Sequence, residues 1–330
     1  MINLPFDGLS LVVLFFALES RTKTIPILPG LKSLDWLGSL LIIGGTICFL
    51  YGLEVGASGQ KSWGSVMVIC LLVFGFIILG LFAVYEARFA TNPLIPGRIL
   101  SSQTNVASII VLCLHSFVFI SYDYFLPLYF QMVLGFKAII SGVCLLALVV
   151  PLSVLTMCTG WYVRRKGDYQ WPIWIGSCFM TLGTGLFIRF GPTLSWPKII
   201  IFQVIVSMGA GPLFQSPMVA LQSHSRHADI AAAMSASSFM RSLCSSMSIV
   251  IGSVLLQKTL HGGKLAPDSE AEKDSGQTMS IQNAASALST MWIFYCAMCG
   301  AMAVASLFIK KMPLQKPLEE QGTSNILEKA

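Results

Sequence analysis

The chain alternates between long apolar stretches and short polar connections. A helix needs about 20 apolar residues to cross a bilayer, and lipid cannot hydrogen-bond the open edge of a sheet. The pattern therefore predicts an all-α integral membrane protein with about nine transmembrane helices. The first expected span ends near Glu19 and has its apolar run at 9–18. The others are expected at 34–53, 64–86, 105–131, 138–163, 170–190, 197–221, 230–257 and 287–309.

Composition and motifs agree with a membrane protein that is not an enzyme. Of the 330 residues, 55% are hydrophobic and 11% are charged, whereas about 25% of a soluble domain is charged. All nine cysteines fall inside apolar stretches, which argues against a disulfide framework. The sequence contains no H-E-x-x-H, no G-x-S-x-G and no glycine-rich phosphate-binding motif. We therefore expect no catalytic residue, no metal site and no cofactor.

The positive charges predict how the chain crosses the membrane. Of the 21 Lys and Arg residues, 13 fall in one set of connections and seven in the other, and Arg241 lies inside a span. Lys and Arg accumulate in cytoplasmic loops, so the first set is expected to be cytoplasmic. The start of the chain then faces outward and its C-terminal tail faces the cytoplasm. The net charge of +6 is explained by this topology, so the expected partner is the lipid bilayer and not nucleic acid.

The stretch 105–131 carries side chains that are unusual for a membrane span. His115 and Asp123 are ionisable, and such groups cost several kcal/mol in hydrocarbon and by default indicate an ion or substrate path. Pro127 lacks an N–H and opposes the carbonyl of Asp123, so a kink is expected there. At about 1.5 Å per residue, His115 and Arg241 lie at one depth near the midplane, and Asp123 lies near the outer interface.

Each of these ionisable groups has a functional and a structural interpretation. Arg241 cannot lose its proton, so it belongs to the transport path or its gate, or it is tied to backbone carbonyls of a neighbouring helix. His115 shuttles a proton, or it is hydrogen-bonded within the bundle. Asp123 is the proton-coupling acid, or it is an interfacial carboxylate in contact with water.

Uncharged polar side chains are further candidates for the wall of a path. Tyr122, Tyr124 and Tyr129 are expected to form an aromatic wall for amphipathic ligands, or an interfacial aromatic belt. Gln203 and Gln215 offer neutral hydrogen-bonding groups on the span 197–221.

The span 197–221 also contains Gly209, Gly211 and Pro212. Two glycines and a proline make a helix locally bendable, which suits a gate or hinge. Close packing against a neighbouring helix accounts for the same residues.

Several motifs resemble those of one transporter family. The matching residues are Asp35-Trp36-Leu37-Gly38; Tyr124, Leu126, Pro127, Tyr129, Phe130 and Gln131; Gly160, Arg165 and Gly167; Gly209, Gly211, Pro212, Gln215 and Pro217; and Arg241. On these residues the chain resembles the C-terminal two-thirds of a fungal fourteen-helix transporter, in the drug:proton antiporter branch of the major facilitator superfamily. The resemblance adds Gln131 to the path candidates. It places Gly160, Arg165 and Gly167, with Arg164 in the same basic turn, in a cytoplasmic loop motif.

The resemblance implies a partial major facilitator fold in four parts. Residues 1–33 are the last helix of an N-terminal half and a cytoplasmic linker, and 34–86 are two extra peripheral helices. Residues 87–311 are the C-terminal six-helix half with an outer loop at 258–286, and 312–330 are a cytoplasmic tail. The family's first five helices have no counterpart, so a missing N-terminal half is an expected partner.

The resemblance also implies a function. It is proton-coupled efflux of small amphipathic compounds, such as drugs, toxins or secondary metabolites, by alternating access at the plasma membrane. The other partners are then protons and a small-molecule substrate. The alternative is a fragment without transport activity that only inserts in the membrane or associates with other membrane proteins. Because alternating access uses two six-helix halves, we expect that the chain alone does not complete a transport cycle.

Overall fold

The computed structural model describes residues 7–13, 35–57, 61–89, 101–193, 195–226, 229–262 and 273–311. These residues form helices and no strand, and a short helix covers 7–13. The longer helices are α3 (Trp36–Ala57), α4 (Val66–Arg88), α5 (Gln103–Met132), α6 (Ala138–Lys166), α7 (Gln170–Phe187), α8 (Trp196–His224), α9 (Ile230–Gly262) and α10 (Lys273–Ser306).

Seven of the described helices are long and apolar enough to cross a membrane. They are α3, α4, α5, α6, α8, α9 and, in α10, the segment Gln282–Ser306. The remaining helix, α7, has 18 residues and packs against α8 and α10. Every span expected from 34–53 onward overlaps one of these helices, and the predicted all-α membrane fold is confirmed. The first expected span lies outside the described residues, apart from 7–13.

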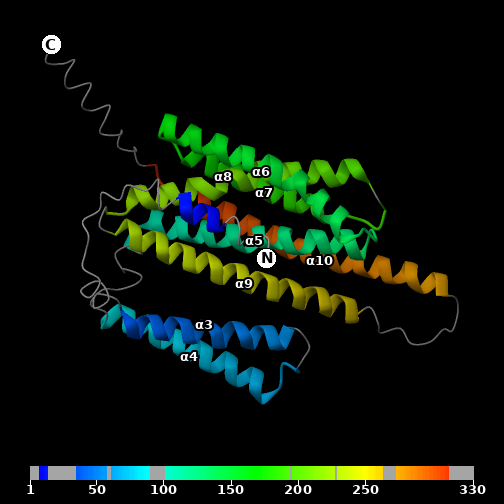
Figure 1. The fold of residues 1–330 in the computed structure, drawn as a ribbon, viewed down its shortest axis with the longest axis horizontal. Coiled ribbons are helices and arrows are strands. Elements are labelled where there is room, and N and C mark those ends of the chain that lie inside the picture. Colours follow the sequence, from blue (N-terminus) through cyan, green and yellow to red (C-terminus); the bar gives the residue numbers. More distant parts are fainter. Residues whose placement is uncertain are drawn as a thin grey trace, which may run out of the picture.

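Helices α5 to α10 form one bundle around a shared apolar core. α8 packs along α6 and α7, α5 packs along α9 and α10, and α7 also contacts α10. Figure 1 shows α6, α7 and α8 along one side of the bundle and α9 along the other, with α5 and α10 between them. The largest fully buried side chains are mostly aromatic, and they include Trp292, Tyr122, Tyr129, Tyr295 and Phe187.

Helices α3 and α4 form a hairpin beside α9 (Figure 1). The two helices approach closely, because a Cβ at Gly75 would lie only 2.6 Å from the backbone nitrogen of Phe49. Asp35 Oδ1 accepts hydrogen bonds from the Gly38 N–H at 2.9 Å and from the Tyr85 hydroxyl at 3.1 Å, which fastens the start of α3 to the end of α4. In the most apolar windows of α3 and α4, 22% and 17% of the residues are buried, so most of this apolar surface is available to lipid.

Helices α7 and α8 cross where glycines face each other. A Cβ at Gly209 would collide with the backbone of Met180, and a Cβ at Gly176 would lie 2.9 Å from the carbonyl oxygen of Gly209. Farther along, a Cβ at Gly183 would lie 2.5 Å from Val206 Cγ2. The absence of side chains at these glycines allows the two backbones to pack at short distance.

The segment 258–286, expected as an outer loop, is partly helical. α9 continues to Gly262, and α10 begins at Lys273. The segments apolar enough to span a membrane end at Thr259 and resume at Gln282. Helical hydrogen bonds close within the segment, so a helix can continue into polar sequence, and the placement of this segment outside the membrane stays a prediction.

Candidate functional site

Arg241 projects from α9 and contacts α5 and α8. Its Nε donates a hydrogen bond of 2.8 Å to Ser116 Oγ, and its Cζ lies 5.8 Å from the centre of the Phe214 ring. A guanidinium within about 6 Å of an aromatic centre is attracted by the ring. Within the described ranges the one ion pair joins Lys311 and Asp168, so Arg241 has no carboxylate partner there. Its contacts are a hydroxyl and a ring, and not the backbone carbonyls of the structural interpretation.

Phe214 also contacts His115. The two rings meet edge to face with 4.8 Å between their centres, and Phe119 stacks on the imidazole at 5.8 Å. His115 is fully buried, and neither ring nitrogen makes a hydrogen bond within the described part of the chain. The Ala210 carbonyl lies near the ring without meeting hydrogen-bond geometry. The structure thus brings His115 and Arg241, which the sequence places at one depth, against the same phenylalanine.

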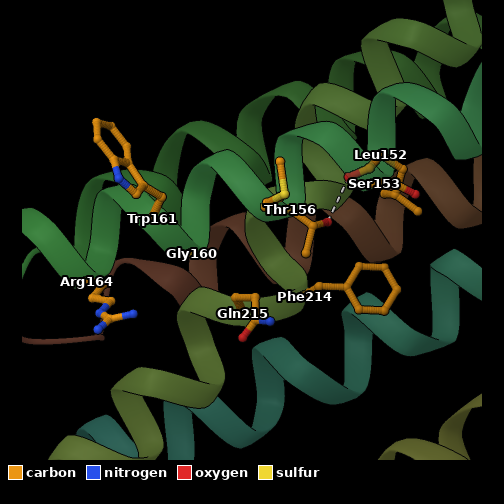
Figure 2. Close-up of a pocket in the computed structure, with 9 residues that line it drawn as sticks. Leu152, Ser153, Thr156, Gly160, Trp161, Arg164, Phe214 and Gln215 are labelled. Atoms are coloured by element: carbon orange, nitrogen blue, oxygen red, sulfur yellow. Dashed lines mark hydrogen bonds between the residues drawn. The ribbon is translucent and has the colours of Figure 1, made fainter. Parts of the chain in front are cut away.

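A cavity of about 590 Å³ opens between α6 and α8 beside Phe214 (Figure 2). In Figure 2, Gly160, Trp161 and Arg164 follow one another along α6, while Phe214 and Gln215 come from the adjacent α8. The cavity is open on one side and is large enough for a small organic molecule. Of the sequence-predicted residues, Gln215, Gly160 and Arg164 are therefore brought together at this cavity.

A second cavity of about 410 Å³ surrounds Arg241. Its other lining residues are Ser116 of α5 and Ser238, Ser242 and Ser245 of α9. The α9 residues recur every three or four positions, so they share one face of the helix. Phe214 lines the first cavity and contacts Arg241, which lines the second. We call the residues that line these two cavities the polar face.

The chemistry available at the polar face is hydrogen bonding and positive charge. Serine hydroxyls donate and accept, the Gln215 amide does both, and arginine only donates. In the residues that the structure describes, no group of three His, Cys, Asp or Glu side chains is arranged to hold a metal ion. The polar face is therefore suited to binding a polar or anionic group next to an aromatic surface.

Three expected path residues are exposed at other positions of α5. Asp123 follows Ser116 by seven residues, so it lies two turns farther along on the same side of the helix. Tyr124 lines a separate cavity of about 470 Å³, which it shares with Glu54 of α3 and residues of α9. Gln131 is exposed at the end of the helix. Of the three, only Asp123 shares the side of α5 that carries Ser116.

Three expected wall residues lie in the core instead. Tyr122 is fully buried, and its hydroxyl shares a hydrogen bond with the Thr184 hydroxyl. Tyr129 is 2% exposed, its hydroxyl donates to the Gly191 carbonyl at 2.8 Å, and its ring stacks on Phe190 at 4.9 Å. Gln203 is fully buried, and its amide donates to the Ile199 carbonyl one turn earlier at 3.0 Å. The Gln203 Oε1 has no hydrogen-bond partner among the described residues. Residue type alone therefore could not tell whether these polar side chains line a path or lie in the core.

The expected gate residues Gly209, Gly211 and Pro212 are buried within α8, which runs as one helix from Trp196 to His224. Gly209 lies at the crossing with α7, and a Cβ at Gly211 would lie 2.9 Å from Leu155 Cβ on α6. Close packing accounts for both glycines, and a gating role stays a prediction.

Pro127 lies inside α5, which also continues as one helix to Met132. Its carbonyl accepts a hydrogen bond of 3.2 Å from Ser141 Oγ at the start of α6. Pro127 therefore marks a contact between consecutive helices, and its expected role as a hinge stays a prediction.

The basic turn between α6 and α7, which was expected to be cytoplasmic, is closed by Gly167. This residue has φ 67°, a left-handed conformation that favours glycine, and its N–H donates to the Val163 carbonyl at 2.9 Å. Arg164 and Arg165 stand in the last turn of α6. Arg164 lines the first cavity, and Arg165 lies 5.3 Å from the centre of the Trp161 ring.

The same turn is tied to the end of α10. Lys311 Nζ lies 2.6 Å from Asp168 Oδ2. Three further hydrogen bonds run from the side chains of Tyr169, Gln170 and Trp174 to the carbonyls of Lys310, Ile309 and Ser306, at 3.0, 2.9 and 3.0 Å. We call this set of contacts the α7–α10 clamp.

The clamp changes the acidity of Asp168. Burial raises the pKa of this carboxyl, but the bond from Lys311 and those from the backbone N–H groups of Gln170 and Trp171 lower it more. The resulting pKa lies below the ordinary value of 3.8, so Asp168 is ionised in the folded protein at neutral pH.

Sequence analysis missed Phe214 and Ser116. Phe214 stands in a span full of apolar residues, and no spacing distinguishes it from a core or lipid-facing ring. Ser116 is the residue after His115, and His115 was expected at the depth of Arg241. Ser116 could therefore have been predicted as a hydrogen-bond partner of Arg241, because its hydroxyl lies at the same depth.

Residues 30–249 match the family model of the Major Facilitator Superfamily. The chain belongs to this superfamily. It is 40% identical over 333 residues to the efflux pump dotC of Dothistroma septosporum, a match that covers 95% of this chain and 57% of the pump. It is 37% identical over 351 residues to the MFS-type transporter ppz2 of Metarhizium majus, with 100% of this chain and 60% of that transporter covered.

A more distant superfamily relative is the uncharacterized MFS-type transporter C1399.02 of Schizosaccharomyces pombe, which is 28% identical over 97% of this chain and 56% of its own length. The chain thus spans 56% to 60% of the length of these curated relatives. Membership of the superfamily, together with the seven apolar helices, makes the chain a multi-pass membrane protein.

Proposed function

We propose that this chain contributes the C-terminal half and two accessory helices of a proton-coupled exporter of small amphipathic compounds. The exporter belongs to the fourteen-helix drug:proton antiporter branch and acts at the plasma membrane. In this proposal α5 to α10 are the six-helix half, and α3 and α4 are the accessory pair. The name of the relative dotC, an efflux pump, supports the direction of transport.

The observation that carries the proposal is the polar face. Ser116, Phe214 and Arg241 lie near the middle of α5, α8 and α9, which are all long and apolar enough on average to cross a membrane. A charged group at that depth is costly unless it meets water, a ligand or a second protein surface. Transporters of this kind bind their substrate near the midplane, where two repeats meet and rock against each other. The polar face supplies one wall of such a site.

Proton coupling needs a titratable group near this wall, and α5 offers two. His115 is buried against Phe214 without a hydrogen bond, and Asp123 is exposed two turns beyond Ser116. His115 is the first candidate because its imidazole contacts Phe214, the ring that also lies under Arg241. Asp123 is the second candidate, because an exposed carboxylate on the same side of the helix can exchange protons with the outer solution.

The proposal is tested by export from yeast cells. We would express the 330-residue chain, the relative dotC, and a chimera in which residues 1–330 replace the matching segment of dotC. The readout is retention of fluorescent amphipathic dyes that dotC exports, with and without a protonophore. The chimera is expected to lower dye retention, and the protonophore is expected to abolish the effect.

Two outcomes define the limits of the proposal. A chimera that inserts normally but leaves dye retention unchanged, while dotC exports, would contradict transport by this segment. If export persists with the protonophore, only the proposed proton coupling is contradicted, and the proposed export is not. The 330-residue chain by itself is expected to leave retention unchanged, because it supplies one wall of the site.

A further inference from the structure

The charge on Arg241 is not balanced within the described protein. Its Nε is bonded to Ser116, and the guanidinium lies over Phe214. Arginine has five N–H donors, and the terminal amino groups find no acceptor among the described side chains. Arg241 lines a cavity of about 410 Å³, so its terminal amino groups are available to a ligand.

A second arginine adds to the positive potential. Arg164 lines the larger cavity, which Phe214 also lines. Among the described residues that line the two cavities, Arg164 and Arg241 are the only charged side chains, and neither cavity has an Asp or Glu in its wall. A cleft of one charge sign within low-dielectric walls concentrates ligands of the opposite sign.

The same surface presents aromatic rings. Phe214 and Trp161 line the larger cavity with the apolar side chains of Leu152 and Met157. Aromatic rings prefer offset stacking or edge-to-face contact with other aromatic rings. Phe214 lines this cavity and its ring centre lies 5.8 Å from Arg241 Cζ, so the inference is that a ligand with its ring here extends a polar group to Arg241.

We propose that the substrates of the polar face are aromatic organic anions, in which a carboxylate, phenolate or sulfonate is attached to a ring system. The ring packs against Phe214 and Trp161, and the anionic group accepts hydrogen bonds from Arg241. This inference rests on the proposed transport function and names its substrate class. A carboxylate from another protein segment could meet the same arginine, but a cavity of about 590 Å³ next to it favours a small molecule.

The test compares three probes of one shape and different charge. The purified 330-residue chain is placed in nanodiscs of zwitterionic phosphatidylcholine, and binding of 2-naphthoate, 2-naphthamide and 2-naphthylmethylammonium is measured by equilibrium dialysis at neutral pH. The anion is expected to bind at least about tenfold more tightly than the neutral amide, the difference made by a charge-assisted hydrogen bond. The ammonium probe is expected to bind more weakly than the amide.

Variants then assign the preference to one side chain. Arg241→Gln is expected to bring the affinities of naphthoate and naphthamide to within about twofold, whereas Arg241→Lys keeps part of the difference. Arg189→Gln makes the same change of charge at an exposed position outside both cavities, and it should leave the preference intact. Each variant is first checked for a single peak in size-exclusion chromatography.

The wild-type comparison keeps the inference testable even if a variant fails to fold. Equal binding of the three probes, tighter binding of the ammonium probe, or no saturable binding of any probe would overturn it. The last result would point to a protein carboxylate as the partner of Arg241. The dialysis needs no transport, so an anion preference without export by the chimera would contradict the proposed function and leave the binding class standing.

Discussion

Arg241 lies over the ring of Phe214, with 5.8 Å between Cζ and the ring centre. This contact partly compensates the charge of an arginine that has no carboxylate partner among the described residues. It also connects the two cavities of the polar face. The strength of the contact can be measured directly.

A double-mutant cycle should detect coupling between the two side chains. Phe214→Leu keeps an apolar side chain but removes the ring, and Arg241→Gln removes the charge. We expect a coupling free energy of about 0.5–2 kcal/mol, the range of cation–π contacts from exposed to desolvated sites. The measurement is the free energy of unfolding of the four proteins in detergent. Additive effects of the two substitutions would show that the ring does not stabilise the guanidinium.

His115→Phe should make the protein more stable and remove its proton coupling. The imidazole is buried between Phe119 and Phe214, and within the described residues neither nitrogen meets hydrogen-bond geometry. An unpaired buried polar group costs about 1–3 kcal/mol. A phenyl ring fills a similar space without this cost. The free energy of unfolding should rise by about 1 kcal/mol or more.

Export by the dotC chimera carrying His115→Phe should then lose its dependence on the proton gradient. His115→Gln serves as a control, because it also removes the titrating group but keeps polar atoms in the site. Asp123→Asn tests the second candidate in the same assay. If export by both His115 variants remains as sensitive to a protonophore as export by the unsubstituted chimera, His115 is not the proton-coupling residue.

Alanine substitutions at two glycines should have opposite effects on stability. A Cβ at Gly209 would meet the backbone of Met180 where α7 and α8 cross, and such overpacking costs about 1–3 kcal/mol. Gly142 of α6 has no neighbour within 4 Å of a built Cβ, so alanine there should stabilise the helix by about 0.5–1 kcal/mol. Thermal unfolding of Gly209→Ala and Gly142→Ala compares the two. A Gly209→Ala protein as stable as the wild type would mean that α8 shifts freely at the crossing.

The Asp168–Lys311 ion pair should stabilise the fold at neutral pH and lose this effect in acid. The pKa of Asp168 is lower in the folded protein than its ordinary value of 3.8, so ionised Asp168 stabilises the fold above about pH 4. This contribution is lost as the pH falls through the lowered pKa. Asp168→Asn should cost up to about 1 kcal/mol at neutral pH, because Lys311 is half exposed, and the difference from the wild type should shrink in acid.

Lys311→Gln provides the matching control for the ion pair. It should cost a similar amount, and adding it to Asp168→Asn should cost little more, since the two side chains act as a pair. The midpoints of thermal unfolding between neutral pH and about pH 3 give the profiles. A difference between Asp168→Asn and the wild type that stays constant into acid would contradict an electrostatic origin.

The helices were predictable because crossing a bilayer imposes a length and an apolar composition that can be read along the chain. What could not be predicted was which side of each helix a polar residue faces. Tyr122 and Tyr129 resemble wall residues in sequence, but both are buried in the core with hydroxyl partners on other segments. Such partners come from positions tens of residues away, so no local pattern reveals them.

The arginine and the histidine of the polar face were identified because ionisable groups are rare within apolar spans. Phe214 was missed because an apolar ring within a span is ordinary, and its importance comes only from contacts with two other helices. The sequence did not show how far α9 and α10 extend, because helices continue beyond the apolar segments that a sequence reveals.

The α7–α10 clamp joins two helix ends that are far apart in the sequence. Four contacts connect the turn before α7 and the first two turns of α7 with Ser306, the last residue of α10, and the residues up to Lys311. Three of these contacts end on backbone carbonyls, so substitution of the accepting residue does not remove the acceptor. A covalent crosslink between the two segments would therefore join helix ends that the fold already holds together, and we expect it to leave the bundle unchanged.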